Sequence, residues 1–173
     1  MSAIGYWCRH VMLDTEAQLL EFLDAQQIPY QRFEHPPVYT CEEAERLRPR
    51  LPAVSTKNLF LRDRQRTFYL LMTACEKKLD LKRVGNLIGA SKLHFASEEM
   101  LSELLNLTRG SVTVLGLINE TEHRVQLWID AEIWQQDNFL CHPLVNTATL
   151  LLSKSSLERF FELSGHGVNL IDM

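Results

Sequence analysis

The hydrophobic and polar positions of this chain alternate between helical stripes and short apolar runs typical of strands. A first helix is predicted over residues 14–27, where Thr15 and Gln18 form a capping box and Pro29 ends the pattern. Further helices are expected after the capping residues Thr40, Asp80, Ser97 and Ser155 or Ser156, and Gly89 and Gly165 end two of them.

Short apolar runs predict the strands at 30–33, 58–62, 68–73, 92–96, 112–118, 124–130, 147–152 and 168–171. The polar segment 63–66 joins two of these strands into a hairpin, and the segment 119–122 joins two others. Because helices interleave with strands while hairpins require antiparallel pairing, we expect an α/β fold with a curved, mixed and largely antiparallel sheet wrapped by helices.

The length of 173 residues, with 46% hydrophobic and 23% charged residues, fits one soluble domain. No apolar run approaches a membrane span, and the segment Met1–His10 lacks the apolar centre of a secretory signal.

The cysteines Cys8, Cys41, Cys75 and Cys141 are scattered without a CxxC pair, which predicts reduced thiols in a cytoplasmic protein. The six histidines show no ligand-like spacing, so no metal site is expected.

Positive charge is concentrated in residues 46–92, which hold twelve basic and three acidic residues in a chain of net charge −4. A basic face on an acidic protein can position a polyanion. The alternative is a set of ordinary solvated helix and hairpin surfaces. The candidate phosphate contacts are Arg62, Arg64, Arg66, Lys77, Lys78, Lys82 and Arg83.

Lys57 stands at the mouth of the strand predicted at 58–62, directly before an apolar run that is typical of a strand buried on both faces. A lysine in this position is partly desolvated, or it points into a cleft where an anionic group meets it. The alternative is a side chain that reaches back to water from the end of the strand.

Two other segments combine backbone and side-chain features suited to binding. In residues 109–113, Gly110 precedes hydroxyl residues, so the turn can present backbone N–H groups to an oxyanion, or it simply ends a helix. In residues 142–147, a proline stiffens a loop that carries His142 and Asn146, or the polar groups only satisfy the turn. Cys141 and His142 would point to opposite faces of a strand, which favours Cys141 as a buried thiol.

Four segments taken together, TKNLFLRD, GSVT…GLIN, HPLVNTAT and the closing SGH, resemble the YbaK/ProX family of aminoacyl-tRNA deacylases. The pattern is most similar to the free-standing prolyl-tRNA editing proteins of the ProXp-ala (PrdX) type. The resemblance covers residues 14–173 in unchanged order and leaves residues 1–13 as an N-terminal extension. It implies a single domain of the YbaK type.

The resemblance implies hydrolysis of the ester in mischarged Ala-tRNA(Pro), with no cofactor, no metal and no protein nucleophile. A hydroxyl of the terminal adenosine would help to activate water. The implied partners are mischarged tRNA and, as a further candidate, prolyl-tRNA synthetase. By position, the resemblance implies catalytic roles for Lys57, Gly110 and His142 and substrate contacts by Thr56, Asn58, Ser111, Val112, Thr113 and Asn146.

One position departs from the family pattern G-x-x-x-P, because Val114 stands where the proline is common. A valine frees φ and restores a backbone donor, which leaves the shape of the Gly110 loop open. Two alternatives to Ala-tRNA(Pro) editing follow. The same fold could act on Ser- or Cys-tRNA, or the chain could be a non-catalytic module that binds tRNA or a synthetase.

Overall fold

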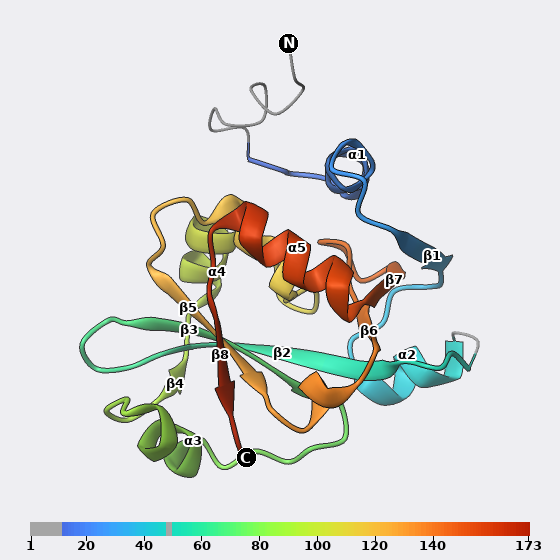
Figure 1. Ribbon diagram of the computed structural model, residues 1–173. Coiled ribbons are helices and arrows are strands. Elements are labelled where there is room, and N and C mark those ends of the chain that lie inside the picture. Colours follow the sequence, from blue (N-terminus) through green and yellow to red (C-terminus); the bar gives the residue numbers. More distant parts are fainter. Residues whose placement is uncertain (1–11, 48–49) are drawn as a thin grey trace.

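The computed structural model describes residues 12–47 and 50–173, and within them eight strands form one mixed sheet (Figure 1). The sheet order is β1-β7-β6-β2-β3-β5-β8, and β4 pairs with β2. The strands are β1 (Tyr30–Glu34), β2 (Val54–Arg62), β3 (Phe68–Ala74), β4 (His94–Phe95), β5 (Val125–Asp130), β6 (Asn138–Cys141), β7 (Ala148–Ser153) and β8 (Val168–Ile171). Antiparallel pairs predominate, and β2–β6, β3–β5 and β5–β8 are parallel.

The helices begin at the capping residues that the sequence indicates, with one exception. They are α1 (Glu16–Ala25), α2 (Cys41–Leu47), α3 (Leu81–Ile88), α4 (Glu98–Leu105) and α5 (Lys154–Ser164), with the 3-10 turns η2 (Val114–Asn119) and η3 (Ile133–Gln135). The capping box of Thr15 and Gln18 is present, and Glu43 and Thr40 bond reciprocally at α2. The exception is α5, which is capped by Ser153 and not by Ser155 or Ser156. No helix of the described residues is long and apolar enough to cross a membrane.

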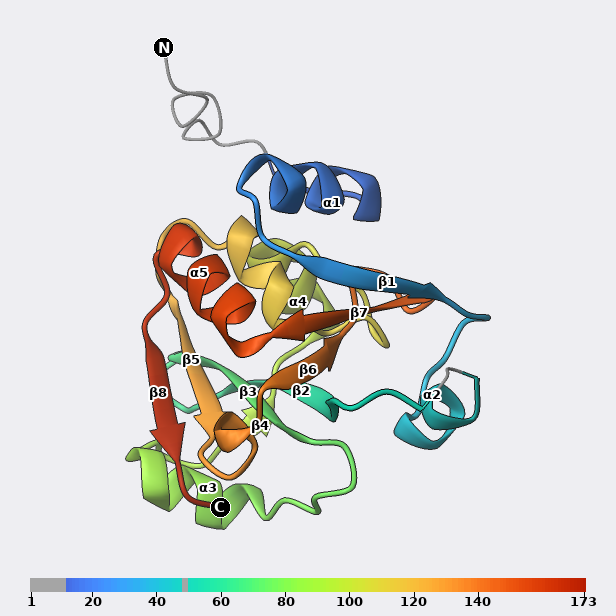
Figure 2. The same ribbon diagram turned by 45° about the vertical axis from the view of Figure 1, so that its right-hand side comes forward.

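The sheet is covered on both faces, as the apolar run in β2 predicts. Phe60 belongs to a large core that β2 shares with α1, α4, α5 and η2, while its neighbour Leu61 belongs to a smaller core under α3. Figure 2 shows α4 and α5 on one side of the central strands and α3 on the other. Because successive side chains of a strand point to opposite faces, one strand anchors both cores.

The second predicted hairpin is wrong. Residues 114–119 form η2, and β5 instead lies parallel between β3 and β8. The Thr113 side chain accepts a hydrogen bond from the backbone N–H of Leu115 and so starts a helical turn. Its first four residues, Val114 to Leu117, are all buried, and a short apolar run buried all round has no periodicity that separates strand from helix.

The chain also departs from expectation at several boundaries. β2 begins at Val54, so Lys57 lies inside the strand and not at its mouth, and β6 was not predicted. Leu13 was assigned to the extension, but it is 2% exposed and packs in the large core. The rest of that predicted extension, apart from Met12, lies outside the described residues.

The expectation of reduced thiols is wrong for two cysteines. Cys41 and Cys75, separated by 34 positions, form a disulfide that ties the start of α2 to the segment after β3. Sequence spacing gives no information on this proximity, because the fold brings the two segments together. Cys141 is a free, buried thiol as predicted, and Cys8 lies outside the described residues.

Candidate active site

A pocket of about 210 Å³ opens beside the first half of β2, where the sheet divides. β2 pairs with β6 through Val54 and Ser55, and with β4 through Leu61 and Arg62. Within the described part of the chain, no strand pairs with residues 56–60 on that edge. The pocket occupies this gap between β6, α2 and the loop after α4, and it brings together Lys57, Asn58, Gly110 and His142.

Lys57 is the cationic side chain of the pocket wall. Its Nζ donates to the backbone carbonyl of Cys75 at 3.0 Å and to that of Lys77. Burial lowers the pKa of Lys57 below its usual value, and the nearby carboxylate of Glu76 opposes this shift. An ammonium has three donors, so these two carbonyls fix its direction and leave one N–H for a ligand.

Asn58 contributes an unsatisfied acceptor. Its Oδ1 is buried and has no hydrogen-bond partner among the described residues. A buried polar atom without a partner costs about 1–3 kcal/mol, and Asn58 is one of the residues that line the pocket, so this oxygen is a candidate acceptor for a donor from a ligand. Thr56, on the same strand, has a hydrogen-bond partner, unlike Oδ1 of Asn58. Its Oγ1 donates to the carbonyl of Leu140 at 2.7 Å and links β2 to β6.

The loop after α4 presents backbone to the pocket. Gly110 has a φ of +88° and, with Val112, lies on the pocket wall. Ser111 and Thr113 instead turn inward. The Ser111 Oγ donates to the carbonyl of Thr108 at 2.9 Å, and Thr113 caps η2. The structure therefore gives these two predicted substrate contacts local bonds within the loop and places neither on the pocket wall.

His142 lies on the pocket wall at the end of β6, and its ring centroid is 6.2 Å from that of His35. Asn146, a further predicted contact, supports the wall from behind because its Nδ2 donates to the carbonyl of Val38 at 3.0 Å. The sequence analysis missed Thr149, which lines the pocket and bonds Nε2 of His35 at 2.9 Å. Thr149 is the final threonine of the HPLVNTAT segment, so that motif could have identified it as a residue of the site.

A second missed feature is the wall formed by Val38, Tyr39 and the start of α2. Tyr39 is 73% exposed at the rim, and its ring lies where a Cβ on Gly110 would point. The disulfide of Cys41 holds this wall to the segment whose carbonyls bind Lys57. No sequence motif marks it, because an exposed tyrosine before a short helix is unremarkable on its own.

The predicted phosphate contacts lie along β2 and around α3. Five of these seven residues are exposed. Among the described residues, only Lys77 of the seven has an ion-pair partner. Lys77 instead contacts the carboxylates of Asp130 and Glu132, both at 2.9 Å. Arg62 follows Lys57 by five positions on β2, which is about 16 Å along a strand. The hairpin arginines thus lie well away from the pocket.

The pocket offers no thiolate nucleophile. Cys41 and Cys75 line it but are joined to each other, and burial raises the pKa of Cys141 to about 12. A thiol with that pKa stays protonated at neutral pH and is a poor nucleophile. The arrangement instead offers a cation, an unpaired acceptor and a glycine turn, which suits the binding and polarisation of a small charged ligand.

Gly110→Ala is expected to lower the free energy of unfolding by more than about 1 kcal/mol, because an L-residue is strained at this φ. The new Cβ would also lie 3.2 Å from Cδ1 of Tyr39. Gly89→Ala is the matched control, since Gly89 has a φ of +72° but open space around it. Urea unfolding of both variants separates the two effects. Equal losses would contradict a specific contact with Tyr39.

Val114→Pro is expected to fold normally and to gain about 0.4–1 kcal/mol, because proline restricts the unfolded chain. Val114 is the first residue of η2, the position at which proline is favoured, and Thr113 before it is extended with φ −148° and ψ 149°. Leu115→Pro is the control, since it removes the N–H that Thr113 caps. A Val114→Pro variant as unstable as Leu115→Pro would show that the loop cannot take the proline.

The model of the aminoacyl-tRNA editing domain matches residues 35–160 of the chain. The chain therefore belongs to the aminoacyl-tRNA editing domain family and is an aminoacyl-tRNA deacylase, a hydrolase of ester bonds. It is 35% identical over 162 residues to the prolyl-tRNA editing protein ProX of Acetoanaerobium sticklandii, across 93% of this chain and 99% of that protein.

A second relative and a solved structure are also similar to this chain. The prolyl-tRNA synthetase associated domain-containing protein 1 of Danio rerio is 35% identical over 156 residues, across 89% of this chain and 85% of that protein. A solved structure described as a candidate trans-editing enzyme for prolyl-tRNA synthetase superposes with a TM-score of 0.67 at 17% identity, across 93% of this chain and 99% of that one. At this identity the second likeness shows the fold alone.

Proposed function

We propose that this protein edits in trans by hydrolysing the ester of mischarged Ala-tRNA(Pro). The observation that carries the proposal is that Lys57, whose ammonium is held by two backbone carbonyls, lines one small pocket together with Asn58, Gly110 and His142. An aminoacyl ester brings an α-ammonium group and a carbonyl that becomes an oxyanion. Asn58 and Lys57 match these two groups in charge and in hydrogen-bonding capacity.

Lys57 acts by position and charge. Its remaining N–H stabilises the developing oxyanion or the terminal phosphate, while the carbonyls of Cys75 and Lys77 hold the ammonium in place. A donor held in advance needs no reorganisation during the reaction, which is the main source of electrostatic catalysis. Backbone donors around Gly110 add to this stabilisation, and His142 orients the substrate or the attacking water from the end of β6.

Water, activated by a hydroxyl of the terminal adenosine, is the attacking group in this proposal. Two observations support it: the sulfurs of Cys41 and Cys75 are joined to each other, and the hydroxyl of Thr56 donates to the carbonyl of Leu140. The water oxygen attacks the ester carbon and its proton passes to the adenosine hydroxyl, which gives its own proton to the leaving ribose oxygen. The ester bond then breaks to release the free amino acid and the tRNA.

Pocket size supports alanine as the amino acid. A volume of about 210 Å³ is below the roughly 300–1,000 Å³ typical of drug-sized ligand sites. Val38, Tyr39 and Val112 bring apolar surface to the wall, and a small apolar pocket admits a methyl side chain while it resists larger ones. Exclusion by size is the route by which an editing site spares the correctly charged tRNA.

The exposed basic residues support tRNA as the carrier of the amino acid. With Arg62 about 16 Å along β2 from Lys57, the hairpin and α3 suit phosphates further along the acceptor arm and not the terminal adenosine. Lys77 is less suited than the others, because its ammonium already contacts two carboxylates. Prolyl-tRNA synthetase is a further proposed partner, and the cytoplasm, where charged tRNA is used, is the proposed compartment.

Asn58→Ala is expected to slow deacylation about 10- to 100-fold, the equivalent of one hydrogen bond to a charged group. Removal of this oxygen should not lower the stability of the free protein and should raise it by up to about 1–3 kcal/mol, since Oδ1 is buried without a partner. Asn58→Asp keeps an acceptor for the α-ammonium and should retain more activity than Asn58→Ala. Single-turnover deacylation and thermal unfolding measure both effects. An unchanged rate for Asn58→Ala would exclude substrate binding at Oδ1.

The proposal is tested by a panel of purified tRNAs mischarged with alanine, serine or cysteine. We expect enzyme-dependent release of alanine from Ala-tRNA(Pro) to be fastest. Faster release of serine or cysteine would keep the fold and the site but overturn the stated substrate. Salt-sensitive tRNA binding without any turnover would instead favour a binding module, the alternative that the Val114 departure raised.

A further inference from the structure

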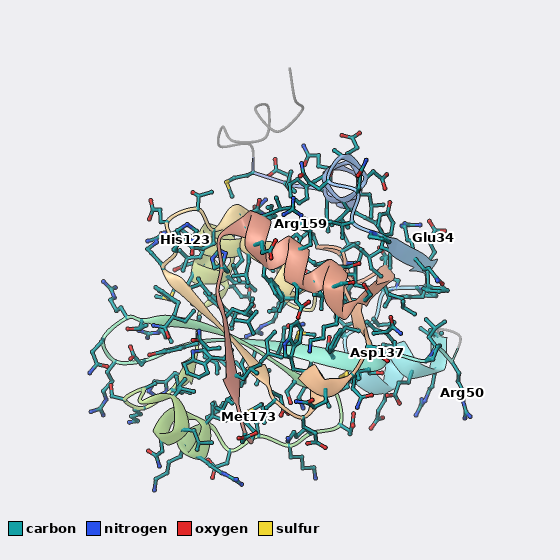
Figure 3. The ribbon with its side chains drawn as sticks, in the orientation of Figure 1. Glu34, Arg50, His123, Asp137, Arg159 and Met173 are labelled. Carbon is teal, nitrogen blue, oxygen red and sulfur yellow. A yellow bond between two sulfur atoms is a disulfide. The ribbon has the colours of Figure 1, made fainter. Side chains whose placement is uncertain are left out.

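The Ser164-Gly165-His166 segment takes no part in the pocket. It meets Glu120 and His123 where the turn between α5 and β8 packs on the connection between η2 and β5. Figure 3 labels His123 on the opposite side of the molecule from Arg50 and α2, next to which the pocket lies. The two sites are therefore separate.

Two of these side chains are buried together. Nε2 of His166 lies 3.2 Å from Oε2 of Glu120, and the residues are 6% and 3% exposed. The ring centroid of His123 is 5.1 Å from that of His166, with the ring planes at 64°. One nitrogen or oxygen atom from each of the three residues lies within 4.8 Å of the others.

The buried pair is oriented by a surrounding set of hydrogen bonds. Nδ1 of His166 lies 3.2 Å from Oγ of Ser164. The two oxygens of Glu120 accept from the backbone N–H groups of Glu122 at 3.2 Å and Val125 at 3.1 Å. Metal ligands in proteins are typically held by such bonds to their other atoms, which fix the direction of the ring and of the carboxylate.

Gly165 leaves room for the third side chain. It ends α5 with a φ of +74°, and a Cβ at this position would lie 2.6 Å from Cε1 of His123. His123 itself is exposed and has a φ of +54°, unusual for a residue other than glycine, so its ring lies over the glycine at the edge of the buried pair. Each residue of the SGH segment thus has a defined part in one cluster.

We propose that Glu120, His123 and His166 bind a divalent cation of the zinc class. Two imidazole nitrogens and one carboxylate oxygen are ligands that Zn²⁺ and Co²⁺ favour, and a water molecule completes a tetrahedral site. On binding, the cation takes the place of a proton at Nε2 of His166, and the neutral imidazole carries its one proton on Nδ1, next to Oγ of Ser164. Bond lengths of about 2.0–2.1 Å put tetrahedral ligands roughly 3.3 Å apart, so the exposed His123 closes onto the pair.

The cation would act as a structural clamp. It joins the η2–β5 connection to the α5–β8 turn, two segments that are more than 40 positions apart in the chain. This separation is why histidine spacing alone predicted no metal site. A ligand that binds only the folded chain raises the melting temperature, by about 5 °C or more at a hundredfold excess over the dissociation constant for a chain of this size.

The test is titration of chelator-treated protein, free of any affinity tag, with Co²⁺ and with Zn²⁺. We expect one equivalent to bind with a dissociation constant in the micromolar range or below. Visible Co²⁺ bands should be those of nitrogen and oxygen ligands, without a thiolate charge-transfer band. His123→Ala should weaken binding at least 10-fold, while His94→Ala, which removes an exposed histidine on β4, should bind as the wild type does.

Because His123 is exposed, His123→Ala should melt at the wild-type temperature without metal and should lose the shift caused by Zn²⁺. This second readout separates loss of a ligand from loss of fold. The proposal is overturned if no stoichiometric binding occurs below about 100 μM metal, well above the dissociation constants of specific zinc sites. It is equally overturned if His123→Ala binds Co²⁺ as tightly as the wild type.

Discussion

Lys57→Met is expected to slow single-turnover deacylation of Ala-tRNA(Pro) by about 100- to 1,000-fold, the cost of losing one preorganised oxyanion donor. Methionine keeps the length and the apolar stem of lysine and removes only the charge. The side chain is half-buried and its ammonium is held by the carbonyls of Cys75 and Lys77, so its position is fixed before substrate arrives. Lys92→Met, at an exposed position outside the pocket, should leave the rate unchanged.

The pH dependence of this rate distinguishes charge from packing. Burial lowers the pKa of Lys57, so the ammonium is lost at a pH below the usual 10.5 of lysine. The enzyme-dependent rate of the wild type should therefore fall as pH rises through that lowered pKa, after subtraction of spontaneous ester hydrolysis. The residual rate of Lys57→Met should show no such fall. A wild-type rate for Lys57→Met would remove Lys57 from the mechanism.

Removing the disulfide with the double substitution Cys41→Ser and Cys75→Ser should lower the free energy of unfolding by about 3–4 kcal/mol. The estimate comes from the chain entropy of a closed loop, here with a sequence separation of 34. Guanidinium unfolding of the wild type, with and without a reducing agent, measures the effect against the double variant. The double substitution avoids leaving a single reactive thiol at the pocket.

The reducing agent should move the wild-type midpoint toward that of the double variant and leave the double variant itself unchanged. Deacylation should fall together with stability, since the disulfide holds the wall of Val38 and Tyr39 against the segment that binds Lys57. In a reducing compartment the bond would be a target for cellular thiols. A midpoint that does not respond to reductant would mean that the two sulfurs are not joined in solution.

Local signals in the sequence predicted much of the fold. Capping residues such as Thr15 and Asp80 define helix starts through short-range hydrogen bonds, and the polar turn between β2 and β3 defines a hairpin. The buried apolar run after Thr113 was misread, because burial on all sides removes the periodicity that distinguishes strand from helix. The parallel pairing of β5 depends on contacts distant in sequence, which no local pattern reports.

The sequence predicted which segments form the candidate site. It did not predict which of their side chains face the pocket. Lys57, Gly110 and His142 do meet in one pocket, but the inward turn of Ser111 and Thr113 follows from bonds that only the folded loop reveals. The unpaired Oδ1 of Asn58 is likewise invisible in a sequence, since it depends on which neighbours fail to reach it. The Cys41–Cys75 bond and the Glu120–His123–His166 cluster each join segments that share no motif.

The central claim is that the pocket around Lys57 removes alanine from proline tRNA and spares proline. The most direct measurement compares, at equal enzyme and tRNA concentrations, the release of alanine from Ala-tRNA(Pro) with the release of proline from Pro-tRNA(Pro). Rapid loss of alanine with proline retained at the background rate is the predicted result. Equal hydrolysis of both esters, or no hydrolysis of either above background, would contradict the account.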